Sequence, residues 1–497
     1  MVQYLQGKRR YLRKKLADGV REMYKFPSKQ IGINDFGMPL GMKLDSENRW
    51  VKKAALIPWE EIEVRYAALF KNRKGNVAKP LRLALGALLI QTQYQYSDNE
   101  VPLQIQETPC LQYFCGMTAY EDKLPFESSL MVYFRKRLTP EILGEINELI
   151  ISKASPSSDE DDGDPPPDDG GTETANKGDL IVDATCAPQN IRYPQDLSLL
   201  DEARENLEKM VDVLHDPTDG EKPRTYRKKA RRDYLKTARK RQKTTREIRK
   251  AIKKQLQYIR RDMEIVDTLL NSGKPLPPWH LERLSTIKKL YEQQVHMYSN
   301  DTHKVEERIV SLGQPWIRPI VRGKAKAKCE FGAKLDISVS NGFVRLEHSS
   351  FDAYNESGNL IEIVERYRRR EGHYPERVLV DGIYRNRGNL AYCKQKGIRL
   401  MGKPLGRPRK DATVNKKQMR ADEIDRIEAE RQLSHAKGSF GLGLIRTRLK
   451  DTSETAIALS IVALNLHNIG RISRALFRRF LDWLSFSGLC RKTQFVQ

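Results

Sequence analysis

The sequence lacks three features that would assign it to other classes of protein. It has only six cysteines in 497 residues, and none forms a CxxC pair or stands near paired histidines, which argues against a zinc site or a disulfide scaffold. No apolar run reaches the roughly 18–20 residues of a membrane span; the longest are 81–90 and 456–466. No apolar signal segment follows the basic N-terminus. We therefore expect free thiols, no membrane contact and a cytoplasmic protein.

What the chain does have is an excess of positive charge. Lys and Arg number 89 against 65 Asp and Glu, which gives a net charge of +24. Such a field attracts polyanions, of which nucleic acid is the commonest. The charge is densest in 221–254, where seventeen Lys and Arg face three acids. Two interpretations stay open for this stretch: a solvated helical arm, or a clamp that follows DNA phosphates.

Composition also divides the chain into parts. Residues 1–153 carry short apolar segments at helical spacing, typical of a helix-turn-helix-like DNA reader or of a plain helical bundle. Residues 154–178 are acidic and rich in Pro and Gly, which predicts a disordered linker. Strand and helix patterns then alternate over 179–475, interrupted by a charged helical insertion at about 198–316, and 476–497 form a C-terminal tail.

Two of the predicted strands end in an aspartate. The apolar runs 180–182 and 378–380 lead directly into Asp183 and Asp381. A strand end is rigid and can aim a carboxylate into the crevice at a sheet edge. Carboxylates are the ligands that Mg²⁺ prefers, and two such ions can stabilise both oxygens of an in-line phosphoryl displacement. The pair therefore suggests a metal site that acts on phosphodiesters.

A predicted hairpin lies between these two strands in the sequence. Residues 334–340 and 343–348 alternate apolar and polar side chains on either side of Asn341-Gly342. This dipeptide is the strongest two-residue hairpin turn, because both of its positions require a positive φ.

A third carboxylate is predicted on a long helix over 421–437. Arg426, Glu430 and Lys437 are four and seven residues apart, which places all three on one helix face. A carboxylate between two cations suits a metal ligand beside DNA phosphates, although a salt-bridged surface helix shows the same spacing. Glu428 is the rival ligand. It lies about 200° around the helix from Glu430, so only one of the two can point into a site.

These motifs resemble the DDE transposases of bacterial insertion sequences, in the IS-four and IS-five superfamily. The resemblance implies a ribonuclease H-like α/β fold: a mixed five-stranded sheet with helices on both faces, a long helical insertion after strand one, and an N-terminal all-helical domain. The segments that carry it are 181–205, 317–342, 352–389, 396–410 and 430–454.

The same resemblance implies the active-site residues. In the family the first Asp closes strand one and the second closes strand four, which correspond to Asp183 and Asp381. The Glu stands on a helix in the order Tyr, two residues, Arg, three residues, Glu, six residues, Lys. Arg426, Glu430 and Lys437 match that order, whereas the Tyr position is Glu423, a departure that leaves any DNA contact of the Tyr in doubt.

The activity implied is transposition. The three carboxylates would hold two Mg²⁺, with Mn²⁺ as a substitute, and the partners would be the terminal inverted repeats and the target DNA, bound by a homodimer. The alternatives are a catalytically silent DNA-binding protein of transposase origin and a ribonuclease H-like nuclease without strand transfer. The predicted DNA contacts are Arg426, Lys437, Arg318, Arg322, Lys324, Arg407, Arg409, Arg446 and Arg448.

Overall fold

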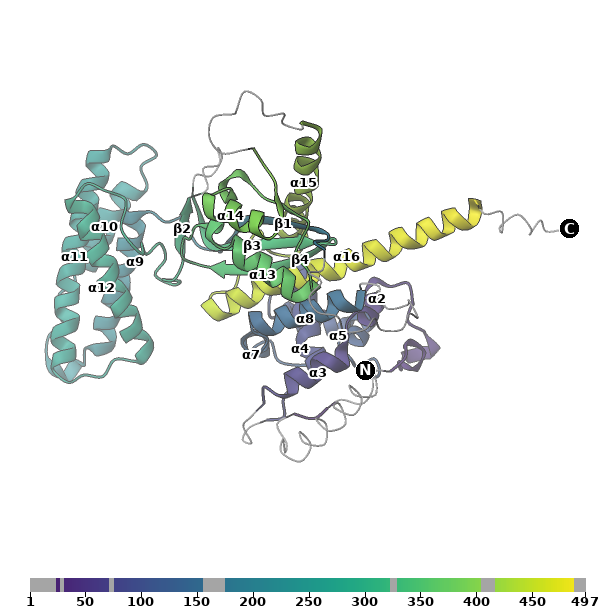
Figure 1. The fold of residues 1–497 in the computed structure, drawn as a ribbon. Coiled ribbons are helices and arrows are strands. Elements are labelled where there is room, and N and C mark those ends of the chain that lie inside the picture. Colours follow the sequence, from purple (N-terminus) through teal and green to yellow (C-terminus); the bar gives the residue numbers. More distant parts are fainter. Residues whose placement is uncertain are drawn as a thin grey trace, which may run out of the picture.

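The computed structural model describes residues 24–26, 31–70, 76–154, 175–321, 329–403 and 416–486, the last range with side chains as far as 471. A mixed sheet lies between a helical N-terminal region and a separate helical bundle (Figure 1). The fold class predicted from the sequence, α/β and ribonuclease H-like with helices on both faces of the sheet, is confirmed.

The N-terminal region is entirely helical in its described part beyond two short 3-10 turns and an isolated bridge. Its central helix α4 (Leu81–Tyr94) begins after Pro80, which tolerates the first turn because its missing N–H would have no helical partner. Almost every side chain of α4 is buried, so this helix is the centre of the region. The helices around it are α2 (Arg49–Leu56), α3 (Trp59–Ala67), α5 (Glu100–Glu107), α6 (Pro109–Phe114), α7 (Leu130–Arg137) and α8 (Pro140–Ala154).

The sheet has the strand order β2-β3-β1-β5-β6. Strand β4 also pairs with β3, over residues 334–340 of β3. Pairing is antiparallel between β1 and β3, β2 and β3, and β3 and β4, and parallel between β1 and β5 and between β5 and β6. The predicted hairpin is confirmed, since Asn341 and Gly342 both have positive φ (52° and 78°). The strands are β1 (Asp179–Pro188), β2 (Arg318–Val321), β3 (Cys329–Ser340), β4 (Phe343–Ser350), β5 (Arg377–Leu379) and β6 (Arg399–Leu400).

Two hydrophobic cores cover the two faces of the sheet. Strand positions alternate between them: Leu180 and Val182 pack with α13 (Leu360–Glu371) and α14 (Arg387–Gln395). Ile181 packs in the core that contains α15 (Lys416–Ser439), α16 (Lys450–Phe486) and the N-terminal helices. The N-terminal region and the last helix therefore share one core with the sheet.

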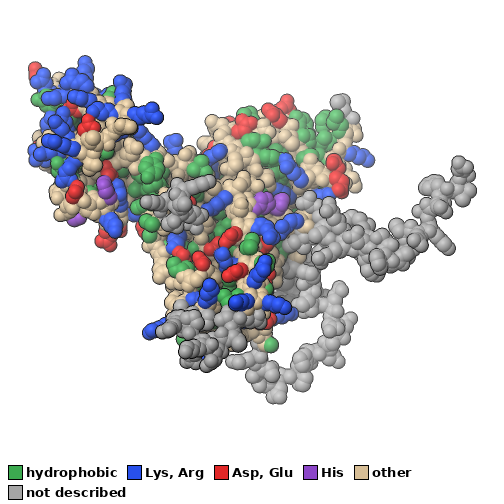
Figure 2. All heavy atoms as spheres, turned by 90° about the horizontal axis from the view of Figure 1, so that it is seen from above, with side chains coloured by type: hydrophobic (Ala, Val, Ile, Leu, Met, Phe, Trp, Pro, Cys, Tyr) green, Lys and Arg blue, Asp and Glu red, His purple; other side chains and the backbone are tan. Residues whose placement is uncertain are grey.

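The insertion forms a helical bundle with a core of its own. It leaves the sheet after β1 and returns at β2, and Figure 1 shows it in teal, standing apart from the rest. Figure 2 shows dense Lys and Arg side chains over it. Its helices are α9 (Asp196–Leu214), α10 (Arg227–Ala238), α11 (Thr245–Asn271) and α12 (Pro278–Ser299).

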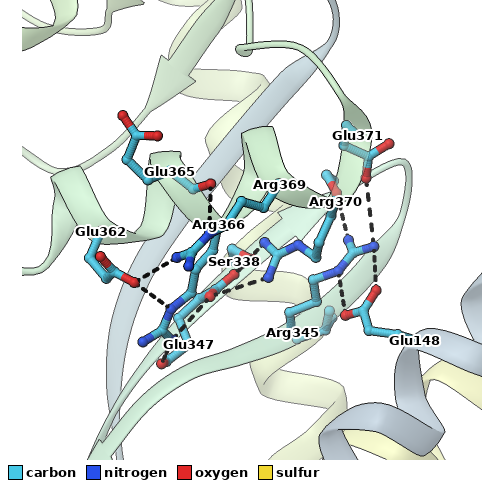
Figure 3. A network of polar contacts seen from close by, with 12 residues as sticks. Glu148, Ser338, Arg345, Glu347, Glu362, Glu365, Arg366, Arg369, Arg370 and Glu371 are labelled. Atoms are coloured by element: carbon cyan, nitrogen blue, oxygen red, sulfur yellow. Dashed lines mark hydrogen bonds and ion pairs between the residues drawn. The ribbon is translucent and has the colours of Figure 1, made fainter.

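A network of buried ion pairs joins the hairpin to helices on either side (Figure 3). Arg345 of β4 donates to both carboxylate oxygens of Glu148 on α8, at 2.8 and 3.1 Å. Glu347, two residues further along β4, accepts from Ser338 Oγ at 2.6 Å and from Arg370 of α13 at 2.7 Å. The network therefore ties the N-terminal region, the hairpin and α13 together.

Two expectations from composition can be compared with this structure. The five cysteines of the described part are free thiols, as expected; Cys490 lies outside the described residues. None of the described helices is long and apolar enough to cross a lipid bilayer. Most of the predicted linker, 155–174, lies outside the described residues, and the predicted domain bounds stay predictions.

Candidate active site

Asp183 and Asp381 are level with each other on neighbouring parallel segments of the sheet. The prediction that Asp183 ends its strand is wrong, because β1 continues to Pro188 through its pairing with β3, whereas Asp381 lies two residues beyond the end of β5. Strand β1 pairs with β5 in a register that sets Ile181 against Leu379, and two more residues along each strand reach the two aspartates. The backbone stays extended at Asp381, with φ −72° and ψ 160°. Adjacent strands lie about 4.8 Å apart, so the register brings the two aspartates to one end of the sheet.

Both aspartates belong to the face of the sheet that α15 covers. Ile181 and Leu379 are buried in the same core as Ala429 of α15. Side chains two positions apart in a strand share a face, so Asp183 and Asp381 emerge on that same side. The sheet therefore directs two carboxylates toward the layer that carries the third predicted ligand.

A backbone N–H orients each of the two carboxylates. Asp183 is half-buried, and its Oδ1 accepts from the N–H of Ala184 at 2.9 Å. Asp381 is exposed, and its Oδ1 accepts from the N–H of Gly382 at 2.6 Å as it caps a short 3-10 turn. Each carboxylate keeps further lone pairs for a metal or another donor.

A buried tyrosine that sequence reasoning missed lies close to the aspartates. Burial raises the pKa of Tyr384, and the charges of Asp336, Glu356, Asp183 and Asp381 raise it further. The phenol therefore stays protonated. Its buried hydroxyl has no hydrogen-bond partner among the described residues, and its ring packs in the core with Leu180 and Val182, on the face of the sheet opposite to Ile181. The only signal in the sequence is an aromatic residue three positions after a strand-end aspartate.

Glu430 lies on α15 but is engaged with its helical neighbour. Its Oε1 is 3.0 Å from Arg426 Nη2, and its side chain is 55% exposed. The predicted common face of Arg426 and Glu430 is confirmed by this contact. Lys437, half-buried, is about two turns further along the same face by helical spacing.

The rival carboxylate, Glu428, points elsewhere. It pairs with Arg431 at 2.6 Å and accepts from Gln432 Nε2, also at 2.6 Å. Its carboxylate also lies 4.0 Å from Arg471 of α16, so it is on the flank of α15 that borders α16. Glu428 and Glu430 therefore pair with different residues on different flanks of α15.

Ion pairs at the other end of the strands fix α15 against the sheet, and sequence reasoning missed them. Asp422, buried in the first half of α15, accepts from Arg399 of β6 at 2.6 and 2.9 Å and from Arg377 of β5 at 3.2 Å. Arg377 also pairs with Asp425 at 2.8 Å and with Asp179 of β1. These contacts bind the helix to the start of both aspartate-bearing strands.

The described residues do not yet form a complete metal site. Across these ranges, no three His, Cys, Asp or Glu side chains lie close enough together to hold a metal ion. Asp183 and Asp381 supply the oxygen donors that Mg²⁺ prefers. The third predicted ligand, Glu430, pairs with Arg426 at 3.0 Å in this structure.

The predicted DNA contacts lie in several places. Arg318 of β2 is largely buried, and its guanidinium is occupied by the carbonyl oxygen of Pro315, at 2.5 Å, and by Asp352, at 3.5 Å. Arg446 and Arg448 line a cavity of about 470 Å³ between the α4–α5 turn and the start of α16. Four others lie outside the described residues: Arg322, Lys324, Arg407 and Arg409.

Comparison with known proteins gives two family matches. Residues 378–467 match the family described as a transposase DDE domain, and residues 39–137 match a family described as a transposase domain, DUF772. The first range contains Asp381 and Glu430, whereas Asp183 precedes it. The second covers α2 to α7 of the N-terminal region.

One curated relative adds to these matches, although its name gives no activity. Over 170 residues the chain is 28% identical to the uncharacterized protein ORF8 in the nfe locus of Rhizobium meliloti, a stretch that covers 34% of this chain and 75% of that protein. No solved structure matches the chain.

Proposed function

Because the chain belongs to the DDE transposases of insertion sequences, we propose that it binds the terminal inverted repeats of its element and catalyses phosphodiester hydrolysis and strand transfer there. The observation that carries the proposal is the register that sets Asp183 level with Asp381 on the face covered by α15. One carboxylate within β1 and one just beyond β5 are held by a rigid sheet, which supports phosphoryl-transfer chemistry.

The proposed metal ligands are Asp183, Asp381 and Glu430, and the proposed ions are two Mg²⁺, with Mn²⁺ as a substitute. When bound, such ions stabilise the charge on the attacking and the leaving oxygen of an in-line displacement. The donor set supports this choice, since carboxylate oxygens suit hard cations.

The chain's own residues would hold the DNA strand during both steps. Hydrolysis at the element's end leaves a 3′-hydroxyl, and that hydroxyl then attacks a phosphodiester of target DNA in the same site. When Glu430 turns toward the aspartates, Arg426 loses its carboxylate partner and becomes available to a DNA phosphate. Lys437, on the same helix face, would bind a neighbouring phosphate.

DNA binding is proposed for two further parts of the molecule. The N-terminal helices would contact the terminal repeat, and the cationic bundle of Figure 2 would follow the phosphates beside it. Strand transfer joins two element ends to one target, so a homodimer on the DNA is the expected assembly.

Cleavage of duplex DNA that carries the inverted repeats flanking the gene tests the proposal. With Mg²⁺ present, Asp183→Asn, Asp381→Asn and Glu430→Gln are each expected to lower the cleavage rate by about 10²–10³-fold or more, the scale on which one electrostatic stabiliser acts. Glu362→Gln, on the distant helix α13 and 57% exposed, is the charge-matched control. DNA binding by each variant is measured in parallel.

The products separate this proposal from its two alternatives. Binding of the repeats with no cleavage in Mg²⁺ or Mn²⁺ would identify a catalytically silent DNA-binding protein. Cleavage without joined products would identify a nuclease that lacks strand transfer. Cleavage and joining that persist in the Asp183→Asn chain would remove that residue from the site.

A further inference from the structure

A cavity of about 450 Å³ lies between α15 and α16, away from the proposed catalytic flank of α15. Most of its lining is polar and able to donate hydrogen bonds. The residues that line it are Arg431, Gln432, Ser434, His435, Ser439, His467, Asn468 and Arg471.

The charges at this cavity are unbalanced. Arg431 pairs with Glu428 at 2.6 Å, and Arg471 reaches the same carboxylate at only 4.0 Å. Both guanidiniums are more than half exposed, at 63% and 51%. One carboxylate therefore serves two arginines, and the cavity carries a net positive charge before either histidine is protonated.

Two of the residues that line the cavity, His435 and His467, are histidines whose rings pack against each other. The ring centroids of His435 and His467 are 4.6 Å apart, and that of His435 is 5.1 Å from the buried ring of Phe440. Nearby, Asn468 donates to Gln432 Oε1 at 3.0 Å, which links α16 to α15 at the floor. The imidazoles are held by packing, and the two guanidiniums beside them are exposed. Together they can donate hydrogen bonds from several directions to the oxygens of one anion.

The position of the cavity indicates which anion it takes. His435 lies about 140° around α15 from Glu430, on the other flank of the helix. The two flanks of a helix are about 10–12 Å apart, too far for one phosphate group to touch both. A phosphate in the cavity is therefore a different one from that at the aspartates.

We propose that the α15–α16 cavity binds a backbone phosphate of DNA, on a nucleotide other than the one that is cut. The inference rests on the proposed function, because DNA is the polyanion that this function brings to α15. It adds a second anchoring point, made by Arg431, Arg471 and the histidine pair, to the helix that carries Glu430.

The test measures binding of a fluorescent duplex by the full chain over a range of salt concentrations. Each phosphate contact contributes about 0.9 to the slope of log K against log salt, so Arg431→Gln combined with Arg471→Gln is expected to lower that slope by about 0.9. The matched control for Arg431→Gln is Arg369→Gln, because Arg369 is also 63% exposed and pairs with a glutamate, Glu362, at 2.8 Å.

A second pair of variants predicts the opposite sign. Glu428→Gln removes the acid that competes with a phosphate for both arginines, so it is expected to tighten DNA binding. Glu362→Gln removes the same charge beside Arg369 and is expected to tighten it less. A purely structural role for Glu428 would weaken binding instead, because it would lower the amount of folded protein.

The outcomes distinguish this inference from the proposed function. Equal slopes for the chain with Arg431→Gln and Arg471→Gln and for the Arg369→Gln chain, both still binding and cleaving, would overturn the inference alone. Failure of the unaltered chain to bind duplex DNA at any salt concentration would overturn the proposed function as well. If inorganic phosphate at millimolar concentration stabilises the unaltered chain but not the Arg431→Gln chain, while the salt slopes of DNA binding by the two chains are equal, the ligand is free phosphate and the DNA assignment is wrong.

Discussion

Replacing the buried Glu347 by glutamine is expected to destabilise the protein far more than the same replacement at the exposed Glu362. The Glu347 carboxylate is 1% exposed and accepts from Ser338 and from Arg370, whose side chain is 21% exposed. Each hydrogen bond to a charged group contributes roughly 1.5–3 kcal/mol. Removing one partner of a buried ion pair costs about 3–5 kcal/mol, since the other charge stays buried. The free energy of unfolding should fall by that amount.

Glu362 supplies the control, because it also accepts from two arginines of α13. It is 57% exposed and pairs with Arg366 and Arg369 at 3.2 and 2.8 Å. Exposed pairs contribute about 0–1 kcal/mol, so Glu362→Gln should unfold almost like the unaltered chain. Urea unfolding followed by circular dichroism compares the two. Equal midpoints for Glu347→Gln and Glu362→Gln would refute the argument that burial decides the cost.

Three further predictions concern stability. Burial raises the pKa of Asp262 in α11 from 3.8 to about 7. The stability that its proton contributes is therefore complete below about pH 4 and is lost as the pH rises through 7. The melting temperature of the Asp262→Asn chain should vary less between about pH 5 and 8 than that of the unaltered chain, and an unchanged profile would contradict this. Gly332→Ala should lower the melting temperature, because a Cβ there would lie 2.1 Å from the Ala187 carbonyl oxygen. A Cβ added at Gly144 in α8 would have no atom within 4 Å. Gly144→Ala should therefore stabilise the protein by roughly 0.5–1 kcal/mol, because alanine favours the helix over glycine. A loss of stability would contradict this argument.

Local patterns predicted the strands that matter for the site. The apolar run before Asp381, the hairpin at Asn341 and the helix that carries Glu430 all have signals within about ten residues. They depend on burial and turn chemistry, which neighbouring residues determine. The structure bears out each of these elements.

The rest depends on contacts between distant segments, which no local pattern contains. Strand β2 has only four residues and is defined by its pairing with β3, which the local sequence does not show. The sheet therefore has six strands where five were predicted. The anchoring of α15 joins Arg377 to Asp422, 45 residues away. The charge of Asp336 raises the pKa of Tyr384 although the two residues belong to distant segments of the chain. Such pairings follow from topology and cannot be read from spacing along the chain.

The shared core of the N-terminal helices and α16 also has a consequence for biosynthesis. Ile457 and Leu464 of α16 are fully buried in the same cluster as Leu85 of α4 and Ile337 of the sheet. A nascent chain that has emerged only as far as α15 exposes that whole apolar surface. The core beneath the sheet face that carries Asp183 and Asp381 therefore cannot close until translation has passed residue 464.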